Sequence, residues 1–536
     1  MNTQHLYWLG EEPEFEESEI SETYETDVIV CGAGIAGVPA ARAAVEAGAE
    51  CILFEKCSQP QARSGQFGVI GGEFLKNWGI DNADKAGEIV NCLMRDGCYR
   101  PKQRILERFA ENIGKDFDWY LDGLDRENLF ISNYSSDVPP EGTKMHVMLM
   151  QYPVSEKYDL YEERYPTYPY TIQIRPGHIF VLKENLKIAE RTGLLRTFFK
   201  TPVKKLLRDA QSGRVTGVIA KDYDGKVIRA YARRGVVLAT GDYAGDQDML
   251  EYYCPGVAEN PKMSCGIDPE KKPNNTGDGH RMGLWIGAKM ETGPHAMNAH
   301  NMGGAMGVTP YLQLDLDGRR FMNEDCPGQQ VENQLSMLRE RTSWQFFDSD
   351  WREQVPYMPL GHGCCSHVVD DEAVAAGTYF DGLGPMDGYA SQDYIDKSIE
   401  RGGTFRADTL EELVELTGLP KETAIASIAR YNELAHKGVD EDFGKTGRRL
   451  FPIESAPFYA SRLTAAPLLC CHGGLESDEE AHCYDENMNV IPGLYAAGNV
   501  QGNRVAVEYP TTLPGFSHSI ALVFGRVAGY NAAMGI

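Results

Sequence analysis

The stretch TDVIVCGAGIAGVPAARAAVEAGAECILFEK, residues 26–56, decides the fold of this chain. Its first apolar run, from Val28 to Cys31, has the length and the β-branched content of a buried parallel strand. Three glycines in GxGxxG spacing follow, then an alanine-rich helical segment, and residues 51–54 form a second apolar run that ends at Glu55. This order of strand, glycines, helix, strand and acid predicts a Rossmann-like unit that binds a dinucleotide.

Each part of this unit has an expected role. Gly32 makes the tight turn, Gly34 lets the backbone approach a pyrophosphate, and Gly37 lets the helix pack closely on the strand. The helix N-terminus offers free N–H groups and the positive end of its dipole to phosphates. Glu55 is placed to accept hydrogen bonds from ribose hydroxyls. The unit alone does not distinguish FAD from NAD.

The bulk properties narrow the class of protein. A chain of 536 residues is too long for one compact core, so two or more domains are expected. The formal net charge of -26 disfavours nucleic acid and anionic membranes as partners, because both would repel this surface. The glutamate-rich residues 1–24 are expected to form a solvated acidic arm.

Cysteine content and the absence of sorting signals bear on the compartment. The thirteen cysteines show no pairing framework, which indicates a reducing environment. The first residues lack the basic start and the apolar run of a signal peptide. No later stretch approaches the roughly 18 to 20 apolar residues of a membrane span. We therefore predict a cytoplasmic, soluble protein.

Four later stretches carry glycines or amides where strands end. RSGQFGVIGG covers residues 63–72, and NTGDGHRMGLWIGAKM, residues 275–290, places a turn before a helix. In GKVIRAYARRGVVLATGDYAGD, residues 225–246, a hairpin turn at Asp224-Gly225 leads to an apolar strand and Thr240-Gly241. GLYAAGN, residues 493–499, reads as a short strand that ends in a glycine and an amide.

Together with the GxGxxG unit, these stretches resemble the flavoprotein family of fumarate reductases, succinate dehydrogenase flavoprotein subunits and 3-ketosteroid dehydrogenases. The resemblance implies FAD as the cofactor and an α/β fold, with a discontinuous Rossmann-like FAD-binding domain and an inserted α+β capping domain. The expected boundaries are an acidic arm at 1–24, the FAD-binding domain at 25–291 and 467–536, and the capping domain at 292–466.

The resemblance also assigns expected FAD contacts to residues of this chain. Gly65 stands where some members of the family carry a histidine bonded to the flavin, so the FAD is expected to be noncovalent. The full set of expected contacts is Gly32, Gly34, Ala36, Gly37, Glu55, Lys56, Arg63, Ser64, Gly65, Gly71, Gly72, Val203, Thr240, Gly241, Asp278, Gly498, Asn499, Gly515, Phe516, Ser517 and Ile520.

The sequence offers no further redox centre. It has no second GxGxxG for a nicotinamide, no CxxCH for a haem, and no cysteine spacing that suits an iron–sulfur cluster or another metal. We therefore expect no metal site. Electrons are expected to pass to or from an external donor or acceptor, which could be a protein.

The positions that hold the substrate in fumarate reductases are changed here. The GxRFxNE motif of that family is present as Gly318, Arg320, Phe321, Asn323 and Glu324. The family's proton-donating arginine nevertheless falls on Gly328, and its carboxylate-binding arginine falls on Thr512. Fumarate is therefore not the expected substrate.

The loop from Tyr509-Pro510 to Pro514-Gly515 resembles the substrate loop of 3-ketosteroid dehydrogenases, with two additional residues. The resemblance implies that Tyr509 and the Gly515 N–H polarise a carbonyl, although Tyr509 could instead only close the loop over the flavin. His472 and Arg504 are further catalytic candidates. The alternatives are that His472 bonds to the backbone near the flavin and that Arg504 pairs with Glu508, four residues on.

These observations predict an FAD-dependent oxidoreductase that acts on a carbon–carbon bond beside a carbonyl. Reduction of a small, neutral and apolar but bulky enone, 3-ketosteroid-like or phenolic, is the leading prediction. The alternatives are a 3-ketosteroid-type dehydrogenase working in the direction of desaturation, a flavin-bearing electron-transfer subunit without its own substrate, and a Rossmann dehydrogenase that uses NAD alone.

Overall fold

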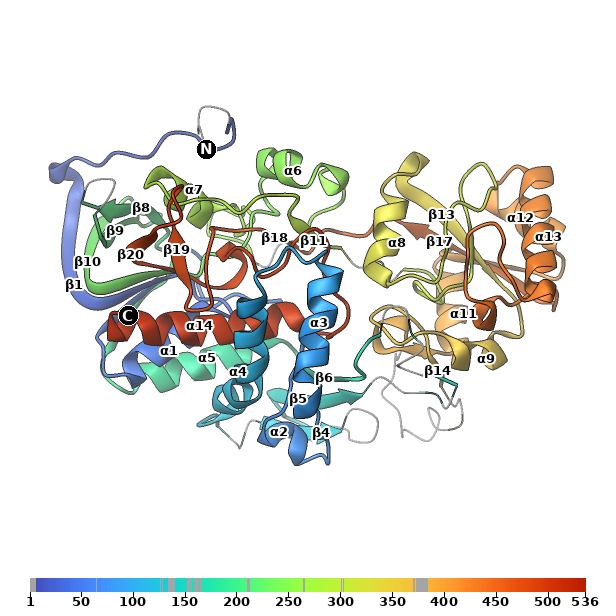
Figure 1. Ribbon diagram of the computed structural model, residues 1–536, viewed down its shortest axis with the longest axis horizontal. Coiled ribbons are helices and arrows are strands. Elements are labelled where there is room, and N and C mark those ends of the chain that lie inside the picture. Colours follow the sequence, from blue (N-terminus) through green and yellow to red (C-terminus); the bar gives the residue numbers. More distant parts are fainter. Residues whose placement is uncertain are drawn as a thin grey trace.

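The computed structural model describes residues 6–63, 65–125, 127, 129–133, 140–151, 155, 157–158, 163, 166–209, 213–263, 266–299, 301, 303–369, 372 and 384–536. Figure 1 shows two lobes side by side, the larger built from both ends of the chain and the smaller from its yellow and orange middle part.

An eight-stranded sheet forms the centre of the larger lobe. Its main path has the order β19-β20-β10-β1-β2-β7, and β8 and β9 extend it beside β10. From β20 to β7 neighbouring strands run parallel, as the Rossmann-like prediction requires. The bounds are β1 Ile20–Cys31, β2 Cys51–Phe54, β7 Leu195–Phe198, β8 Val203–Arg208, β9 Val215–Lys221, β10 Val227–Leu238, β19 His482–Tyr484 and β20 Val490–Ala496.

The first strand is longer than the apolar run that predicted it. Residues 20–25 of β1 alternate between partly buried and exposed, whereas residues 26–31 are all buried. The alternating half pairs in parallel with residues 227–231 of β10, the part of β10 that pairs with β9 on its other side. Backbone pairing with the predicted β9–β10 hairpin therefore extends the strand into polar sequence.

Helices cover both faces of this sheet (Figure 1). Helix α14 packs on α1 at backbone distance, because a Cβ at Gly525 or Gly529 would lie 2.2 Å from Ala36 O or 2.1 Å from Ala40 O. The helices of the larger lobe are α1 Gly37–Glu46, α2 Glu73–Lys76, α3 Ala86–Asp96, α4 Gln103–Leu121, α5 His178–Glu190, α6 Gln247–Tyr253, α7 Asp278–Trp285 and α14 Phe516–Met534. A second sheet beside them has the order β3-β6-β5-β4, with bounds Gly65–Phe67, Tyr170–Arg175, Met145–Gln151 and Leu129–Asn133.

The smaller lobe has its own sheet and its own apolar core. Its strand order is β12-β13-β17-β16, with bounds Leu312–Leu314, Thr342–Phe347, Phe458–Thr464 and Thr404–Ala407. Its helices are α8 Gly328–Leu335, α9 Trp351–Gln354, α11 Gln392–Glu400, α12 Leu410–Thr417 and α13 Lys421–Lys437, and β14 His367–Val368 pairs with β15 Tyr389–Ala390.

Two chain segments connect the lobes. They meet as the antiparallel pair β11, Ala296–Asn298, and β18, Cys470–His472. The α/β class with a Rossmann-like parallel sheet is confirmed. The exact domain boundaries at 291 and 466 stay a prediction.

The expectation of a solvated N-terminal arm is wrong for Leu6, Trp8 and Leu9, which are buried. Trp8 is 3% exposed and packs against Tyr253 with ring centroids 5.6 Å apart. Arg281 donates a hydrogen bond to the Trp8 carbonyl oxygen at 3.0 Å. Apolar side chains at the start of the acidic segment are thus covered by α6 and α7, which the charge pattern alone does not reveal.

Candidate functional site

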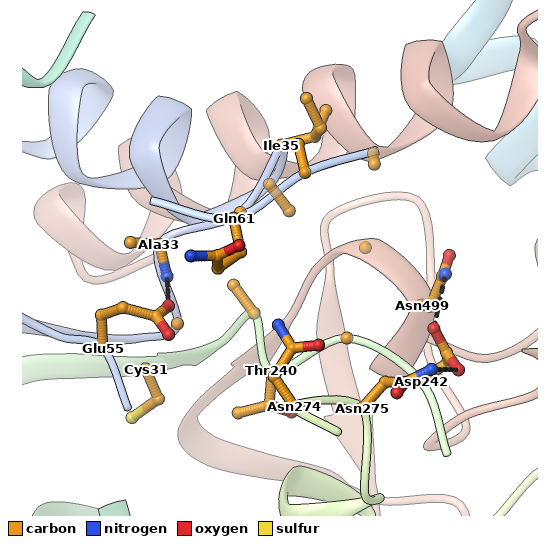
Figure 2. A pocket seen from close by; sticks show the side chains of 18 of the residues that line it. Cys31, Ala33, Ile35, Glu55, Gln61, Thr240, Asp242, Asn274, Asn275 and Asn499 are labelled. Carbon is orange, nitrogen blue, oxygen red and sulfur yellow. Dashed lines mark hydrogen bonds between the residues drawn. The ribbon is translucent and has the colours of Figure 1, made fainter. Parts of the chain in front are cut away.

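A groove opens at the carboxyl ends of β1, β2 and β10, where ligands of open parallel sheets bind. It encloses about 1090 Å³ of empty space, part of it open to solvent. Figure 2 shows side chains from separate segments turned toward it, with Glu55 on one side and Asp242 and Asn499 on the other.

Glu55 is held rigidly at one end of this groove. Its two carboxylate oxygens accept the backbone N–H groups of Ala33 and Cys57, each at 2.7 Å. A carboxylate fixed in this way keeps lone pairs for hydroxyl donors. The geometry therefore suits the ribose contact expected of Glu55.

The glycines of the motif are required by close backbone contacts. Gly32 has φ 105°, and a Cβ there would lie 2.4 Å from Ala239 O. A Cβ at Gly37 would lie 1.8 Å from Gly32 O. At Gly34, which lines the groove, the nearest atom to a Cβ would be Gln61 O at 3.4 Å. A side chain at 34 would thus fill ligand space, whereas one at 32 or 37 would break the strand–helix packing.

Two buried polar atoms beside the groove, Thr240 Oγ1 and Asn275 Oδ1, have no hydrogen-bond partner among the residues that the structure describes. They point into the wall, because a Cβ at Gly279 would lie 2.0 Å from Thr240 Oγ1 and a Cβ at Gly245 would lie 2.9 Å from Asn275 Oδ1. The groove itself is lined by the Gly34 backbone, which leads into the N-terminus of α1, and by the carboxylate of Glu55. This combination fits the pyrophosphate and the ribose of a flavin dinucleotide.

A second set of side chains lies beyond Asn499, around the loop of residues 502–515. The Tyr509 hydroxyl accepts the Ser517 N–H at 3.1 Å, and its ring stacks on His472 at 5.0 Å and 20°. Burial raises the pKa of Tyr509, while the Ser517 N–H acts in the opposite sense. Because Ser517 also lines the groove, the loop brings a neutral phenol close to the cofactor site.

Gly328 and Thr512, the positions at which the resemblance to fumarate reductases predicts arginines, lie in packed surroundings. A Cβ at Gly328 would lie 2.8 Å from Val308 Cγ2 and 3.1 Å from His362 O. Thr512 is buried and its hydroxyl donates to Asp96 at 2.8 Å. Neither position therefore carries a cation in this structure, and a side chain at residue 328 would contact Val308.

Residues 27–511 match the protein family described as FAD binding domain. The chain belongs to this FAD-binding family. A 3-oxosteroid 1-dehydrogenase of Mycolicibacterium smegmatis is 26% identical in an alignment of 604 positions, gaps included. The alignment covers 95% of this chain and 97% of that protein. An NADH:acrylate oxidoreductase of Vibrio harveyi is 28% identical over 369 residues, which cover 67% of this chain. The alignment spans only 32% of the Vibrio protein.

Among solved structures, the chain resembles the 3-ketosteroid-Δ4-(5α)-dehydrogenase of Rhodococcus jostii RHA1 in complex with 4-androstene-3,17-dione. The TM-score is 0.66 at 23% identity, with 97% of this chain and 99% of the other covered, which shows the shared fold. The chain is thus an FAD-dependent oxidoreductase of the type that acts on CH–CH groups, and its cofactor is FAD.

Most of the FAD contacts expected from the sequence line the groove. Lys56 and Asp278 do so as an ion pair, with Nζ 2.8 Å from Oδ2. Burial alone would raise the pKa of Asp278, but the Lys56 ammonium outweighs it and lowers that pKa. The expected contacts found along the wall are Gly32, Gly34, Ala36, Glu55, Lys56, Arg63, Val203, Thr240, Gly241, Asp278, Gly498, Asn499 and Ser517.

Seven expected contacts do not line this groove, and Ser64 lies outside the described residues. Gly71 and Gly72 face other parts of the protein, because the Gly71 N–H bonds to Asn82 and a Cβ at Gly72 would lie 2.8 Å from Gly114 O in α4. The other five pack in the wall behind the groove, in α1, β3 and the start of α14: Gly37, Gly65, Gly515, Phe516 and Ile520.

Like Gly37 and Gly72, Gly65 and Gly515 have no room for a side chain. A Cβ at Gly65 would lie 2.7 Å from His518 Cε1, so the position used for covalent attachment elsewhere is filled by a neighbouring ring. At Gly515, with φ 87°, a Cβ would lie 2.5 Å from the backbone of Gln66. Both glycines bring β3 and the N-terminus of α14 together.

Arg504 lies behind the groove wall and is 2% exposed. Its Nη2 donates to Asn499 Oδ1 at 3.1 Å and its Nε to Gln501 O at 3.0 Å. Burial lowers the pKa of Arg504 to about 10, so the guanidinium remains charged at neutral pH. It contacts the groove through Asn499 and, in this structure, has no surface facing a substrate.

The expected pair between Arg504 and Glu508 is wrong. Glu508 instead accepts a short hydrogen bond from Asn333 Nδ2 of α8, and its other oxygen accepts the Tyr509 N–H at 2.9 Å. The turn between the two residues directs Arg504 toward the groove and Glu508 toward the smaller lobe. The Tyr509 loop is thereby attached to the lobe that carries α8.

Sequence reasoning missed five polar residues of the groove wall, which are Gln61, Asp242, Asn274, Asn275 and His518. Asp242 and Asn275 are bonded to each other at 3.0 Å, and His518 bonds to Gln66 O at 3.0 Å. A signal for Asp242 was present, because the loop that follows a buried parallel strand lies at the ligand edge of the sheet, and Asp242 is the fourth residue after β10 ends. Asn275 and His518 have no comparable local signal.

Two searches of the part of the chain that the structure describes gave negative results. None of its helices is both long enough and apolar enough to cross a bilayer. Within the same residues, no group of three or more histidine, cysteine, aspartate or glutamate side chains is placed to hold a metal ion.

Proposed function

We propose that this flavoenzyme reduces the carbon–carbon double bond of a neutral, bulky enone, with Tyr509 as the group that polarises the ketone or relays the proton. A 3-oxo steroid and a phenolic enone are the substrate types that fit best. The cofactor supplies hydride chemistry at a carbon conjugated to a carbonyl, and the protein must supply a donor for the oxygen and a proton for the second carbon.

The observation that carries the proposal is the contact between the Tyr509 hydroxyl and the Ser517 N–H at 3.1 Å. A phenol that accepts an N–H retains its own proton for donation, and the helix N-terminus stabilises charge that develops on its oxygen. Gly515, the residue before α14, contributes an N–H at the same helix end. Donors held in a buried site before the substrate arrives are effective at stabilising an enolate.

Burial supports a donor rather than a base. Because burial raises the pKa of Tyr509, the phenol is protonated at neutral pH. The stacked His472 ring covers one face of Tyr509 and restricts its rotation. His472 is therefore proposed as a positioning residue, and Arg504, which bonds to Asn499, as another.

The neutral character of the substrate follows from Gly328 and Thr512. Neither position offers a cation, and packing at Gly328 excludes a longer side chain. A carboxylate substrate placed there would lose its hydration without gaining a bidentate partner. The proposal also includes an external electron donor, small or protein, because we expect no second redox centre in the chain.

Desaturation of a 3-oxosteroid is the second candidate. It is favoured by the end-to-end similarity to a 3-oxosteroid 1-dehydrogenase, which covers 95% of this chain. The same Tyr509 would then polarise the ketone so that the adjacent carbon loses its proton more readily. The two candidates differ in the direction of electron flow and not in the site.

The test uses two substrates with one skeleton, 4-phenylbut-3-en-2-one and cinnamate, which differ only in ketone against carboxylate. The purified holoprotein is assayed anaerobically with reduced methyl viologen, with fumarate and a 3-oxo-4-ene steroid in the same series. We expect kcat/KM for the ketone to exceed that for cinnamate at least tenfold. Faster turnover of cinnamate or fumarate than of either ketone would overturn the proposal.

The direction of the reaction, reduction or desaturation, is tested with the saturated 3-oxosteroid as substrate and an oxidised dye as electron acceptor. Dye reduction at a rate above the enone reduction rate would favour the second candidate. If no small molecule reoxidises the reduced flavin and a partner protein does, both candidates fail.

A further inference from the structure

We propose that Asp242 is a cofactor-binding residue whose carboxylate accepts a hydrogen bond from a ribityl hydroxyl of FAD, and that Arg504 positions this contact through Asn499. This inference concerns the cofactor alone. It therefore stands or falls independently of the substrate proposed above.

Asp242 is buried in the groove wall with one oxygen engaged and the other largely open. It lies in the loop after β10, four residues beyond Leu238, and is 1% exposed. Its Oδ1 accepts the Ala244 N–H at 2.7 Å and Asn275 Nδ2 at 3.0 Å. Among the residues that the structure describes, its Oδ2 accepts one hydrogen bond, a long one of 3.5 Å from Asn499 Nδ2. A carboxylate oxygen can accept two hydrogen bonds, so Oδ2 has capacity for a stronger donor.

The position of Asp242 along the groove selects the part of FAD that it meets. Figure 2 shows Asp242, Asn275 and Asn499 together, across the groove from Glu55 and Ala33. Glu55 is suited to the adenosine ribose, and the helix N-terminus at Gly34 is suited to the pyrophosphate. A carboxylate would repel the pyrophosphate, whereas the ribityl chain carries three hydroxyl donors. The hydroxyls of that chain are the cofactor groups that match an acceptor at this place.

Burial raises the pKa of Asp242, while the N–H donors of Ala244 and Asn275 and the nearby Arg63 guanidinium act in the opposite sense. Arg63 lines the same groove. The oxygens of a carboxyl group are acceptors for hydroxyl donors such as those of the ribityl chain.

Arg504 fixes the direction of the amide between the two charges. Its Nη2 donates to Asn499 Oδ1 at 3.1 Å, so Asn499 Nδ2 must point the other way, toward Asp242 Oδ2. If the Asn499 amide were reversed, its oxygen would face the carboxylate and its NH₂ group would face the guanidinium. A positive group, a dipole and a negative group thus form a chain that holds Asp242 Oδ2 at the groove.

The bonds from Asp242 to Ala244 and Asn275 would also suit an aspartate that only shapes the turn after β10. The experiment must therefore measure a contact with the cofactor and not merely stability. FAD is removed from the full-length protein, and the affinity of the apoprotein for FAD is measured by quenching of flavin fluorescence. The same titration is done with FAD analogues that each lack one ribityl hydroxyl.

We expect Asp242→Asn to bind FAD at least tenfold more weakly than the unchanged protein. At least one deoxy analogue should also bind at least tenfold more weakly to the unchanged protein, and this loss should shrink below threefold in Asp242→Asn. Asp246→Asn is the matched control, because Asp246 caps α6 through Met249 N and does not line the groove. It should bind FAD within twofold of the unchanged protein.

Equal affinity of Asp242→Asn and the unchanged protein for FAD would overturn the proposal. It would also be overturned if every deoxy analogue bound as tightly as FAD, a result that needs no variant. If Asp242→Asn does not fold, Asp242→Ser replaces it in the same cycle, because serine keeps an acceptor for the Ala244 N–H. Arg504→Gln should reduce the loss of affinity that the deoxy analogue shows relative to FAD. An unchanged loss of affinity would refute the positioning role of Arg504.

Discussion

The Tyr509 hydroxyl lies 3.1 Å from the backbone nitrogen of Ser517 and accepts its N–H. The two residues are eight positions apart, joined by a Pro-rich turn that ends where α14 begins. Ser517 also lines the cofactor groove. The helix end that faces the cofactor thus also holds the phenol.

Replacing Tyr509 by phenylalanine should abolish most of the turnover without loss of FAD. A positioned acid or hydrogen-bond donor contributes about 10²- to 10⁴-fold, so kcat for the enone should fall at least about 100-fold. Stopped-flow reduction of the flavin by the external donor should remain within about twofold, since that step does not use the substrate carbonyl. The measurement is steady-state and stopped-flow kinetics on protein with full flavin content.

Tyr120→Phe is the matched control for this prediction. Tyr120 is buried, and its hydroxyl has no hydrogen-bond partner in the described part of the chain. Its removal should leave turnover unchanged. Turnover of Tyr509→Phe at the level of this control would exclude Tyr509 from the chemistry.

Gly328→Ala should destabilise the protein mainly through its contact with Val308. A Cβ at 328 would lie 2.8 Å from Val308 Cγ2, and overpacking of this kind costs about 1 to 3 kcal/mol. Alanine is otherwise favourable at a helix start compared with glycine. Val308→Ala removes the opposing methyl groups and should itself cost about 1 to 3 kcal/mol by leaving a cavity.

The double variant Gly328→Ala/Val308→Ala should be more stable than the sum of the single effects by at least about 0.5 kcal/mol, because residues in contact couple. Chemical denaturation of the unchanged protein, the two single variants and the double variant measures this coupling free energy. Strict additivity would show that His362 O, and not Val308, limits the space at residue 328.

The parts of the fold that the sequence predicts are those coded locally. Residues 26–56 contain the whole βαβ unit, and close backbone contacts explain why Gly32 and Gly37 are glycines. The groove wall is different, because Asp242, Asn275 and Asn499 come from three distant segments. Their meeting depends on the order of β10 and β20 in the sheet, which no local pattern contains.

Long-range packing also explains the two incorrect expectations. Arg504 and Glu508 have the spacing of a helical ion pair, but Gln501, Asn499 and Asn333 provide closer partners in a loop. The arm was expected to be solvated because of its charge. Trp8, near its start, is buried by aromatic residues of α6 that are more than 240 positions away.

Glu508 should make stability pH-dependent on the acid side of neutrality. Burial raises the pKa of Glu508 from an ordinary 4.5 to about 7, and Asp96 acts in the same sense, while Asn333 and the Tyr509 N–H oppose it. The folded state therefore binds the proton more tightly than the unfolded state. The stabilisation is fully present below about pH 4.5 and is lost as the pH rises toward 7.

Glu508→Gln carries no titrating group and keeps an acceptor for Asn333. Its melting temperature should change less between pH 5 and 8 than that of the unchanged protein. The melting temperatures of the two proteins should differ least near pH 5. Differential scanning calorimetry at fixed ionic strength measures both curves. If the difference in melting temperature between the two proteins grew toward low pH, the pKa of Glu508 would be lowered in the folded state and the prediction would be wrong.

Arg504→Gln should lower the midpoint potential of the flavin. The guanidinium is buried one residue behind the groove, and its charge stabilises an electron-rich reduced flavin more than the oxidised form. Loss of about 1.4 kcal/mol of this stabilisation corresponds to about 30 mV for a two-electron couple. Arg504→Lys keeps the charge and should shift the potential by less than half as much.

Dye-coupled titration with xanthine and xanthine oxidase measures these potentials on protein with full flavin content. Arg208→Gln is the control, because Arg208 likewise donates two hydrogen bonds, to the carbonyls of Gly213 and Ile286, but lies outside the groove wall. Its potential should equal that of the unchanged protein. Equal shifts in Arg504→Gln and Arg504→Lys would show that the hydrogen bond to Asn499, and not the charge, sets the potential. A rise in Arg504→Gln would contradict both explanations.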